Sequence, residues 1–234
     1  GTETIPKCHK IIGPGNSYAT AAKRVLANHI DGGLPAGPSE CIILADENAD
    51  PEKVALDWMI EAEHGPDSAA LLVTHDAELV EKARKIVEVQ LTKISDKRRE
   101  FITINYNTYG GAVITDSLEQ SIEFVNDYAP GHMEVMTKDP FVVLPKIKNA
   151  GEILLGDYTP VTLCNFVLGP NAILPTGQFA KTYSSVSVND FLKRSSVGFA
   201  SKDGFKMVRD YAYKIAQVEG FETHGLAVKE RKVD

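Results

Sequence analysis

In the stretch ECIILADENADPEKVALDWMIEAEHGPDSAALLVTH, residues 40–75, two short apolar runs flank a helical pattern. The runs ECIILAD and AALLVTH are nearly continuous in apolar residues, as expected for strands of a sheet that is covered on both faces. Between the runs, Asp50 offers an N-cap and Pro51 takes the first helical position. Apolar residues then recur at helical spacing as far as Ala62. The stretch therefore predicts a strand, a helix and a second strand in succession.

The same alternation extends on both sides of this stretch. Strand-like runs are KCHKIIG, FITINY, GAVIT, HMEVMT and GEILLGD, and helical patterns include residues 16–28, DAELVEKARKIVEVQLTKI and SLEQSIEFVNDY. After about Tyr183 the pattern changes to helices alone, with VNDFLKR and DGFKMVRDYAYKIAQVEGF. Alternating strands and helices favour an α/β fold, with a mostly parallel sheet and helices on both faces. The end of the chain is predicted to be a small helical module.

Composition and charge narrow the class of protein. The 234 residues suffice for one large domain or two small ones, and 43% apolar with 24% charged residues is typical of soluble globular proteins. The net charge of −7 leaves no basic surface for nucleic acid, and no apolar run approaches the roughly 20 residues that cross a bilayer. We therefore expect neither nucleic acid nor a membrane as a partner.

The three cysteines, Cys8, Cys41 and Cys164, are odd in number and far apart. This spacing favours reduced thiols in a cytoplasmic protein over a disulfide framework or a cysteine zinc site. No signal peptide opens the chain, which begins GTETIPKCHK without an initiator methionine, directly ahead of a strand-like run. We expect a cytoplasmic protein of which this chain is one piece.

Glu61 and His64 are three residues apart, so on a helix they share one face. Because Gly65 and Pro66 follow, His64 lies in the last helical turn, where a capping histidine is favoured by the helix dipole and Glu61 would be exposed. The alternative is a pair of metal ligands. That alternative needs partners from elsewhere in the chain, because two side chains do not complete a four-coordinate site.

The segment IIGPGNSYATAAKR places two glycines between a strand-like run and a helix start. A helix N-terminus with free N–H groups suits a phosphate, and glycine allows close approach. The alternative is that the Gly-Pro-Gly sequence only forms a turn that reverses the direction of the chain. The segment lacks the G-x-G-x-x-G fingerprint of dinucleotide-binding loops.

The remaining candidates are scattered. His132 lies between a helix and a strand, where α/β enzymes often place working side chains, and His224 lies at the end of the final helix. Ser39 lies in a tight turn before a strand, where it could be only a turn hydroxyl. We interpret three further histidines as structural: His9, His29 and His75.

Several motifs together resemble one enzyme family. GPGNSYATAAKR, AGPSECIILADENADPEKVALDWMIEAEHGPDS, YAPGHMEV, LLGDYTP, GPNAILPTG and DFLKR occur in the order and approximate spacing of histidinol dehydrogenase. The resemblance covers essentially the whole chain and corresponds to the C-terminal half of a family member, or slightly more. It implies a zinc-dependent, NAD-linked homodimer that oxidises L-histidinol through an aldehyde to L-histidine.

The resemblance also implies an architecture of incomplete Rossmann-like domains and a helical tail that crosses to the partner subunit. Residues 1–38 would end the smaller, NAD-side domain. Residues 39–183 would form the second half of the larger domain. Residues 184–234 would be the helical dimerisation tail.

Site residues follow from the same resemblance. Asn16 falls at an NAD-contacting position and Ser39 at a substrate-contacting one. His132 corresponds to the catalytic base, and Glu219 corresponds to a substrate contact made across the dimer.

Four positions correspond to the zinc ligands: Glu61, His64, Asn165 and His224. The family carries Gln where this chain has Glu61, and Asp where it has Asn165. The two changes exchange a carboxylate and an amide, so the formal charge of the ligands is unchanged. Both groups offer oxygen to zinc, and two imidazoles fit its preferences. We hypothesise that the metal site survives.

At the positions that correspond to the substrate site, this chain departs further from the family pattern. Where the family has a Glu-His pair, this chain has Gly131 and His132, so it lacks the carboxylate that activates water for the aldehyde-to-acid step. Losing a general base typically costs roughly 10²–10⁴-fold in rate. Glu134 could face the same side of a strand, but acids are common there in the family and we do not count it as a replacement. Ala172 replaces a substrate-contacting histidine, and DGGLPAGPSE is shorter than its family equivalent and lacks an Ile-Asp pair.

Three functions remain open. The first is oxidation of L-histidinol in histidine biosynthesis. The second is a related zinc- and NAD-linked dehydrogenase for another small polar alcohol, such as a hydroxylated sulfonate, because a one-step oxidation needs no activated water. The third is an inactive zinc-binding homologue. Retention of His64, His132 and His224 argues against the third.

Overall fold

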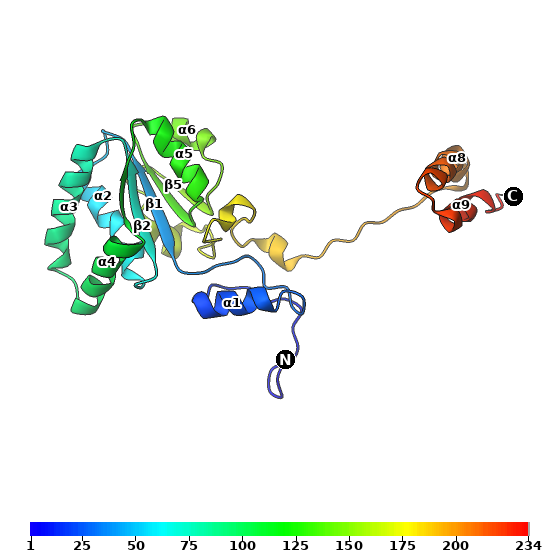
Figure 1. Cartoon of the computed structure of the whole chain (residues 1–234), viewed down its shortest axis with the longest axis horizontal. Coiled ribbons are helices and arrows are strands. Elements are labelled where there is room, and N and C mark those ends of the chain that lie inside the picture. The colour runs from blue at the N-terminus through cyan, green and yellow to red at the C-terminus, as the bar shows by residue number, and fades with distance from the viewer. Residues whose placement is uncertain (234) are drawn as a thin grey trace. The chain divides into compact units, whose positions relative to one another are not determined.

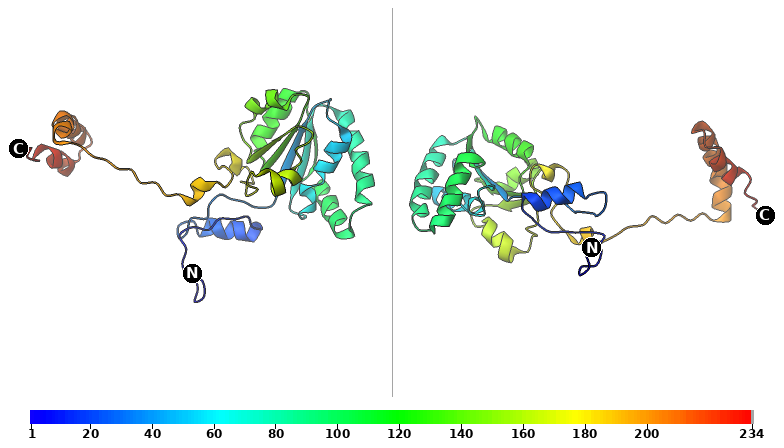
Figure 2. Two further views of the ribbon diagram at one scale, coloured as in Figure 1. Left: turned by 180° about the vertical axis from the view of Figure 1, so that it is seen from behind. Right: turned by 60° about the horizontal axis from the view of Figure 1, so that its bottom comes forward.

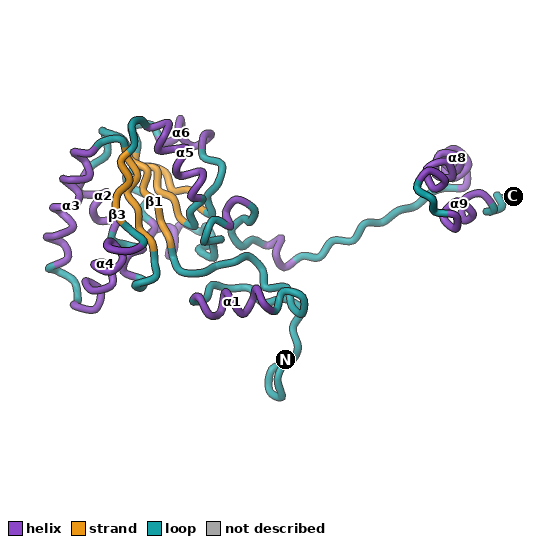
Figure 3. Tube along the Cα trace, viewed as in Figure 1, coloured by secondary structure: helices purple, strands orange, loops and turns teal. Residues whose placement is uncertain are grey.

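The computed structural model describes residues 1–233. Its largest element is a sheet of five strands in the order β3-β2-β1-β4-β5 (Figure 3). The strands are β1 (Glu40–Ala45), β2 (Ala69–Thr74), β3 (Gly111–Ile114), β4 (His132–Met136) and β5 (Glu152–Leu155). Every neighbouring pair is parallel. The predicted α/β fold with a parallel sheet is confirmed.

Helices cover both faces of this sheet. One face carries α2 (Pro51–Trp58), α3 (Ala77–Leu91) and α4 (Asp96–Thr108), and the other carries α5 (Leu118–Tyr128) and α6 (Pro140–Val143) (Figure 1, Figure 2). Alternate residues of β1 enter different cores, since Ile43 packs with Trp58 of α2 and Ile42 packs with Val125 of α5. Burial on both faces accounts for the nearly continuous apolar runs in the central strands.

The start of α2 follows the sequence signals closely. The Asp50 side chain accepts a hydrogen bond from the Glu52 amide, and Pro51 is the first helical residue. The helix is shorter than its apolar pattern suggests, because it ends at Trp58 and a separate 3-10 turn follows at Glu61–Glu63. This break sets the direction of the Glu61 side chain independently of α2.

Two strand predictions are wrong. FITINY lies inside α4, whose first turn is capped by the Ser95 side chain and whose buried residues Ile102 and Asn105 are three apart. A six-residue apolar alternation cannot distinguish a strand from one face of a helix. KCHKIIG forms only an isolated bridge between Lys10 and Asp31, because no further strand pairs with it among residues 1–233.

The remaining elements of the described chain are short or terminal. They are α1 (Ser17–Val25), α7 (Val161–Leu163) with a π-helical turn at Cys164–Leu168, 3-10 turns at Leu144–Lys146, Phe179–Lys181 and Val188–Phe191, α8 (Lys202–Val218) and α9 (Glu222–Lys229). The predicted helix VNDFLKR is thus reduced to a 3-10 turn. The chain divides into two compact units, the second of which begins at Leu192. The predicted boundaries after residues 38 and 183 remain predictions.

The second unit is a pair of helices that pack on each other. Gly225 of α9 lies against the ring of Tyr213 in α8, where an added Cβ would be 3.2 Å from a ring carbon. Large apolar side chains of α8 are exposed, namely Met207, Val208, Tyr211, Ile215 and Val218. Within residues 1–233, no helix combines the length and the apolar character that spanning a bilayer requires.

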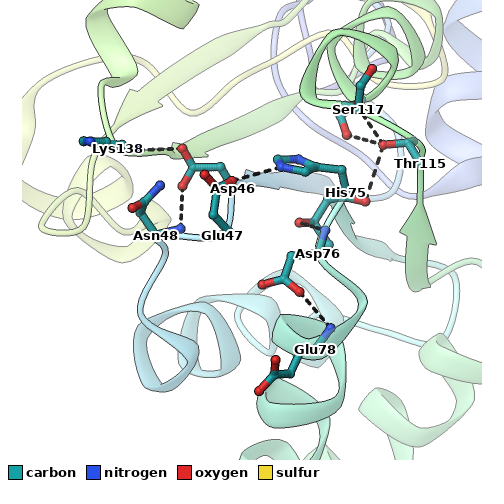
Figure 4. A network of polar contacts seen from close by, with 11 residues as sticks. Asp46, Glu47, Asn48, His75, Asp76, Glu78, Thr115, Ser117 and Lys138 are labelled. Atoms are coloured by element: carbon teal, nitrogen blue, oxygen red, sulfur yellow. Dashed lines mark hydrogen bonds and ion pairs between the residues drawn. The ribbon is translucent and has the colours of Figure 1, made fainter.

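Polar contacts fasten the loops at the carboxyl ends of the strands (Figure 4). The Asp46 carboxylate accepts hydrogen bonds from the amides of Asn48, at 2.9 Å, and Lys138, at 2.8 Å. It therefore joins the loop after β1 to the loop after β4. Glu47 and His75 form a contact of 2.9 Å nearby, which is an ion pair only when the imidazole is protonated, and the Glu47 side chain is 62% exposed. The buried Asp46 carries more of the stability at this edge, because its partners are backbone groups that would otherwise lack an acceptor.

We expect Asp46→Ala to lower the free energy of unfolding by roughly 1–3 kcal/mol, because two part-buried hydrogen bonds to backbone amides are lost. Urea denaturation of the complete protein measures this change. Glu47→Ala is the matched control, and we expect it to cost less than about 1 kcal/mol, as exposed ion pairs do. Equal effects of the two substitutions would contradict the role given to Asp46.

Candidate functional site

Three of the predicted site residues of the first unit lie at the amino edge of the sheet. Ser39 immediately precedes β1, His64 lies ahead of β2, and His132 is the first residue of β4. Open α/β sheets usually bind ligands beyond the carboxyl ends of their strands. His132 lies at the opposite edge, because α5 delivers the chain to the beginning of a strand.

Three of the predicted residues come together here. The Ser39 hydroxyl lies 3.4 Å from His64 Nδ1, and the Glu61 Oε2 atom lies 3.7 Å from His64 Nε2. The imidazole therefore lies between a hydroxyl and a carboxylate. The His64 side chain is 48% exposed, whereas the Glu61 side chain is 1% exposed. The alternative in which Glu61 is an exposed surface residue is wrong, because the 3-10 turn directs its side chain into the protein.

The Glu61 carboxylate has no hydrogen-bond partner. Both of its oxygens are buried without one among the described residues, as is Oδ1 of Asn165. An unpartnered buried carboxylate is expensive, since water has been removed and nothing has replaced it. A bound cation is one way to satisfy such oxygens.

These donors fit zinc chemically. Carboxylate oxygen, imidazole nitrogen and amide oxygen are all available, and two ligands of a tetrahedral zinc with bonds of about 2.1 Å are about 3.4 Å apart. The observed Glu61–His64 separation of 3.7 Å is close to that value. No group of three or more His, Cys, Asp and Glu side chains converges on a metal position within residues 1–233. A complete site would need Asn165 and a further ligand in addition to this pair.

His132 belongs to a buried chain of polar side chains. Its Nδ1 lies 2.9 Å from Oε2 of Glu152, and the Cys164 thiol donates to Oε1 of Glu152 over 2.7 Å. Burial opposes the charge of Glu152, but the hydrogen bonds from His132 and Cys164 outweigh it and lower its pKa. Burial and the contact with Glu152 raise the pKa of the Cys164 thiol to about 12. Glu152 is therefore ionised and Cys164 is a thiol at neutral pH.

Glu40 adjoins the backbone of Gly131. Its Oε1 atom accepts hydrogen bonds from the amides of Gly131, at 3.2 Å, and Gly177, at 3.0 Å. Burial raises the pKa of Glu40 to about 7, although the two amides act in the other direction. Glu40, Ser39 and Tyr128 line a cavity of about 480 Å³.

Glu134 lies on the same face of β4 as His132, as its spacing suggested. Its Oε1 atom accepts a hydrogen bond of 2.8 Å from the Val161 amide, and its carboxyl group hydrogen-bonds to Asp57. Burial raises the pKa of Glu134 and raises that of Asp57 to about 6. Glu134 therefore anchors α7 to the sheet.

Asn16 caps α1. Its side-chain oxygen accepts a hydrogen bond of 3.0 Å from the Ala19 amide, which leaves the Nδ2 group for other contacts. Glu219 and His224 lie in the second unit, where Glu219 ends α8 and the His224 ring packs on Phe221 with centroids 5.0 Å apart. The predicted cofactor, substrate and metal roles of these three residues remain predictions.

Glu40, Glu152 and Cys164 are not among the residues that the sequence predicts for the site. Their partners come from other strands and loops, so no local spacing reveals them. Strand position was an available signal for Glu40 alone, because Glu40 opens a strand directly after Ser39, whereas Glu152 adjoins His132 only through the pairing of β4 with β5.

Comparison with known proteins places this geometry in a family. The histidinol dehydrogenase family model matches residues 1–232. The chain belongs to the histidinol dehydrogenase family. It is 52% identical over 232 residues to histidinol dehydrogenase from Synechocystis sp., covering 99% of this chain and 54% of that protein. It is 47% identical over 229 residues to a histidinol dehydrogenase homolog from Colwellia psychrerythraea, covering 97% of this chain and 51% of that protein.

A solved structure agrees with the sequence comparisons. The crystal structure of histidinol dehydrogenase from Elizabethkingia anophelis superposes with a TM-score of 0.91 at 36% identity, covering 97% of this chain and 52% of that one. The chain thus spans about half the length of the histidinol dehydrogenases that it matches.

Two positions that depart from the histidinol dehydrogenase pattern, Gly131 and Ala172, have different surroundings in this chain. At Gly131, an added Cβ would lie 3.3 Å from Thr176 Cγ2 and 3.6 Å from Glu40 Cγ, so neighbouring side chains already occupy the space beside it. Ala172, in contrast, lies exposed on a loop.

The raised pKa of Glu40 predicts a pH dependence of stability. A carboxyl group with a pKa of about 7 when folded and about 4.5 when unfolded stabilises the fold fully below pH 4.5. That contribution is lost between about pH 4.5 and 7, by up to about 1.4 kcal/mol per pH unit. Glu40→Gln should flatten this decline, so its stability relative to the unmodified protein should rise with pH.

Urea denaturation at several values between pH 4.5 and 8 measures the difference. Glu123→Gln, an exposed position on α5, controls for the loss of one negative charge. Parallel stability curves for Glu40→Gln and the unmodified protein would show that Glu40 titrates normally.

Proposed function

We propose that the complete protein oxidises L-histidinol to L-histidine through the aldehyde, using zinc and NAD. Membership of the histidinol dehydrogenase family supports the reaction class. The observation that carries the proposal is the buried, unpartnered carboxylate of Glu61 beside the imidazole of His64 and the hydroxyl of Ser39. We further propose a cytoplasmic homodimer that assembles through α8 and α9, whose apolar residues are exposed in the chain alone.

The proposed zinc ligands are Glu61, His64, Asn165 and His224. Zinc bound there would act as a Lewis acid that polarises the alcohol oxygen. The first three ligands belong to one compact unit, and His224 belongs to the other. Ser39, which lies beside His64, is suited to orient a polar group of the substrate in the adjacent cavity.

His132 is the proposed base. It accepts the hydroxyl proton while the carbinol carbon gives a hydride to NAD. Nδ1 of the ring is occupied by Glu152, so the proton is taken at Nε2. In this proposal Asn16 contacts NAD and Glu219 contacts the substrate across the dimer.

The second candidate is one-step oxidation of another small polar alcohol, such as a hydroxylated sulfonate. The glycine at position 131 favours it, because no carboxylate side chain extends from the residue before His132 to activate water. Ala172 also favours the second candidate, because its methyl group offers no hydrogen bond to an imidazole substrate. An inactive zinc-binding homologue is the third candidate.

The number of NADH molecules formed per L-histidinol separates these functions. The experiment uses the complete protein with zinc and excess NAD, with NADH followed by absorbance and products identified by mass spectrometry. The proposed function predicts two NADH per histidinol. One NADH with accumulated aldehyde would mean that the second oxidation fails for lack of a water-activating group. No NADH from histidinol, but one from a hydroxylated sulfonate, would establish the second candidate.

His132→Ala provides the control for the assignment of the base. We expect it to lower kcat by roughly 10²–10⁴-fold with bound zinc unchanged, because His132 is not among the proposed ligands. His64→Ala should remove zinc and activity together. Loss of zinc in His132→Ala, or retention of zinc in His64→Ala, would overturn the assignment.

A further inference from the structure

The base and a carboxylate face each other across two neighbouring strands. His132 opens β4, Glu152 opens β5, and the two residues are in register with each other. A backbone hydrogen bond of 2.9 Å from the Glu152 amide to the Gly131 carbonyl fixes this register. The Nδ1–Oε2 distance is 2.9 Å, and the two side chains are only 8% and 5% exposed. The contact is therefore built into the sheet.

This contact determines which ring nitrogen carries the proton. An ionised carboxylate can only accept hydrogen bonds, so the neutral imidazole must hold its proton on Nδ1. Nε2 then keeps its lone pair. Within residues 1–233, no protein group makes a hydrogen bond to Nε2. The free nitrogen is the one that can act as a base.

The carboxylate itself is held in place on its other side. Oε1 of Glu152 accepts the hydrogen bond of 2.7 Å from the Cys164 thiol. Cys164 is buried at the junction of α7 and the π-helical turn, and it packs with Leu154 of β5 and Val161 of α7. With one oxygen bound to a thiol and the other to an imidazole, the carboxylate cannot rotate without losing a buried partner.

Neighbouring carboxylates do not share this contact. Glu40 is engaged by the amides of Gly131 and Gly177. Glu134 is engaged by the Val161 amide and by Asp57. Among the described residues, Glu152 is the carboxylate with a hydrogen bond to the His132 ring.

We propose that Glu152 is the positioning residue for His132, fixing the tautomer in which Nε2 is the base and pairing with the imidazolium that forms. The inference rests on the proposed function for the identity of the base. When the alcohol is oxidised, the O–H proton moves to Nε2 of His132 and the carbon-bound hydride moves to NAD⁺, leaving a carbonyl and NADH. The positive charge on the ring is then offset by Glu152, as in other His–carboxylate pairs.

Glu152→Gln in the complete protein tests this role. The neutral amide can accept from Nδ1–H or donate to Nδ1, so it no longer selects one tautomer. We expect kcat to fall about 100-fold or more with KM and zinc content little changed. In ¹⁵N spectra of histidine-labelled protein, with His132 assigned by its loss in His132→Ala, the neutral ring should carry its proton on Nδ1. The variant should show the Nε2–H form or a mixture.

Two further variants sharpen the experiment. Glu123→Gln removes an exposed carboxylate of α5 without touching the contact, so the His132 spectrum and kcat should stay unchanged. Glu152→Asp keeps the charge but withdraws the oxygen, so kcat should lie between those of the unmodified protein and Glu152→Gln. If Glu152→Gln does not fold, this variant carries the test.

The spectra distinguish failure of this inference from failure of the proposed function. An active enzyme whose His132 tautomer and kcat are unchanged by Glu152→Gln would overturn the positioning role and leave the reaction standing. A protein inactive on all alcohols, yet with a tautomer that depends on Glu152, would support the positioning and overturn the reaction.

Discussion

Parallel pairing of β1, β4 and β5 is the constraint on which the site depends. In register, Cys41 lies beside His132, and His132 lies beside Glu152. Because side chains alternate along a strand, these three residues share one face and share it with Glu134. The sheet therefore gathers ionisable groups from distant parts of the sequence at its amino edge, where main-chain hydrogen bonds hold them in place.

Burial makes each carboxylate at this edge expensive, and the protein satisfies them differently. Glu40 accepts hydrogen bonds from two backbone amides. Glu134 accepts one from a backbone amide and hydrogen-bonds to a neighbouring carboxyl group. Glu152 accepts one hydrogen bond from an imidazole and one from a thiol. Among the described residues, both oxygens of Glu61 are buried without a hydrogen-bond partner, whereas in Glu134 only Oε2 is. The fold supplies hydrogen bonds to the first three, whereas it supplies none to either oxygen of Glu61, as the proposed metal site would require. This contrast supports a metal role for Glu61 better than its spacing from His64 did.

Much of the fold was readable from the sequence, because burial on both faces leaves apolar runs such as ECIILAD, and because Asp50 with Pro51 marks a helix start unambiguously. FITINY was misread, since six residues cannot separate a strand from a helix face. The Glu152 contact was beyond reach, because a sequence does not state which strands are neighbours or in what register. Burial of Glu61 was equally hidden, since it follows from the break between α2 and the 3-10 turn.

The most direct test of zinc binding by Glu61 and His64 is anomalous diffraction, on both sides of the zinc absorption edge, from crystals of the complete protein grown with zinc. We expect one strong peak at the amino edge of the sheet, about 2.0–2.2 Å from a Glu61 oxygen and a His64 nitrogen. A peak that excludes Glu61, or a Glu61 carboxylate paired with a protein side chain and no metal, would contradict it.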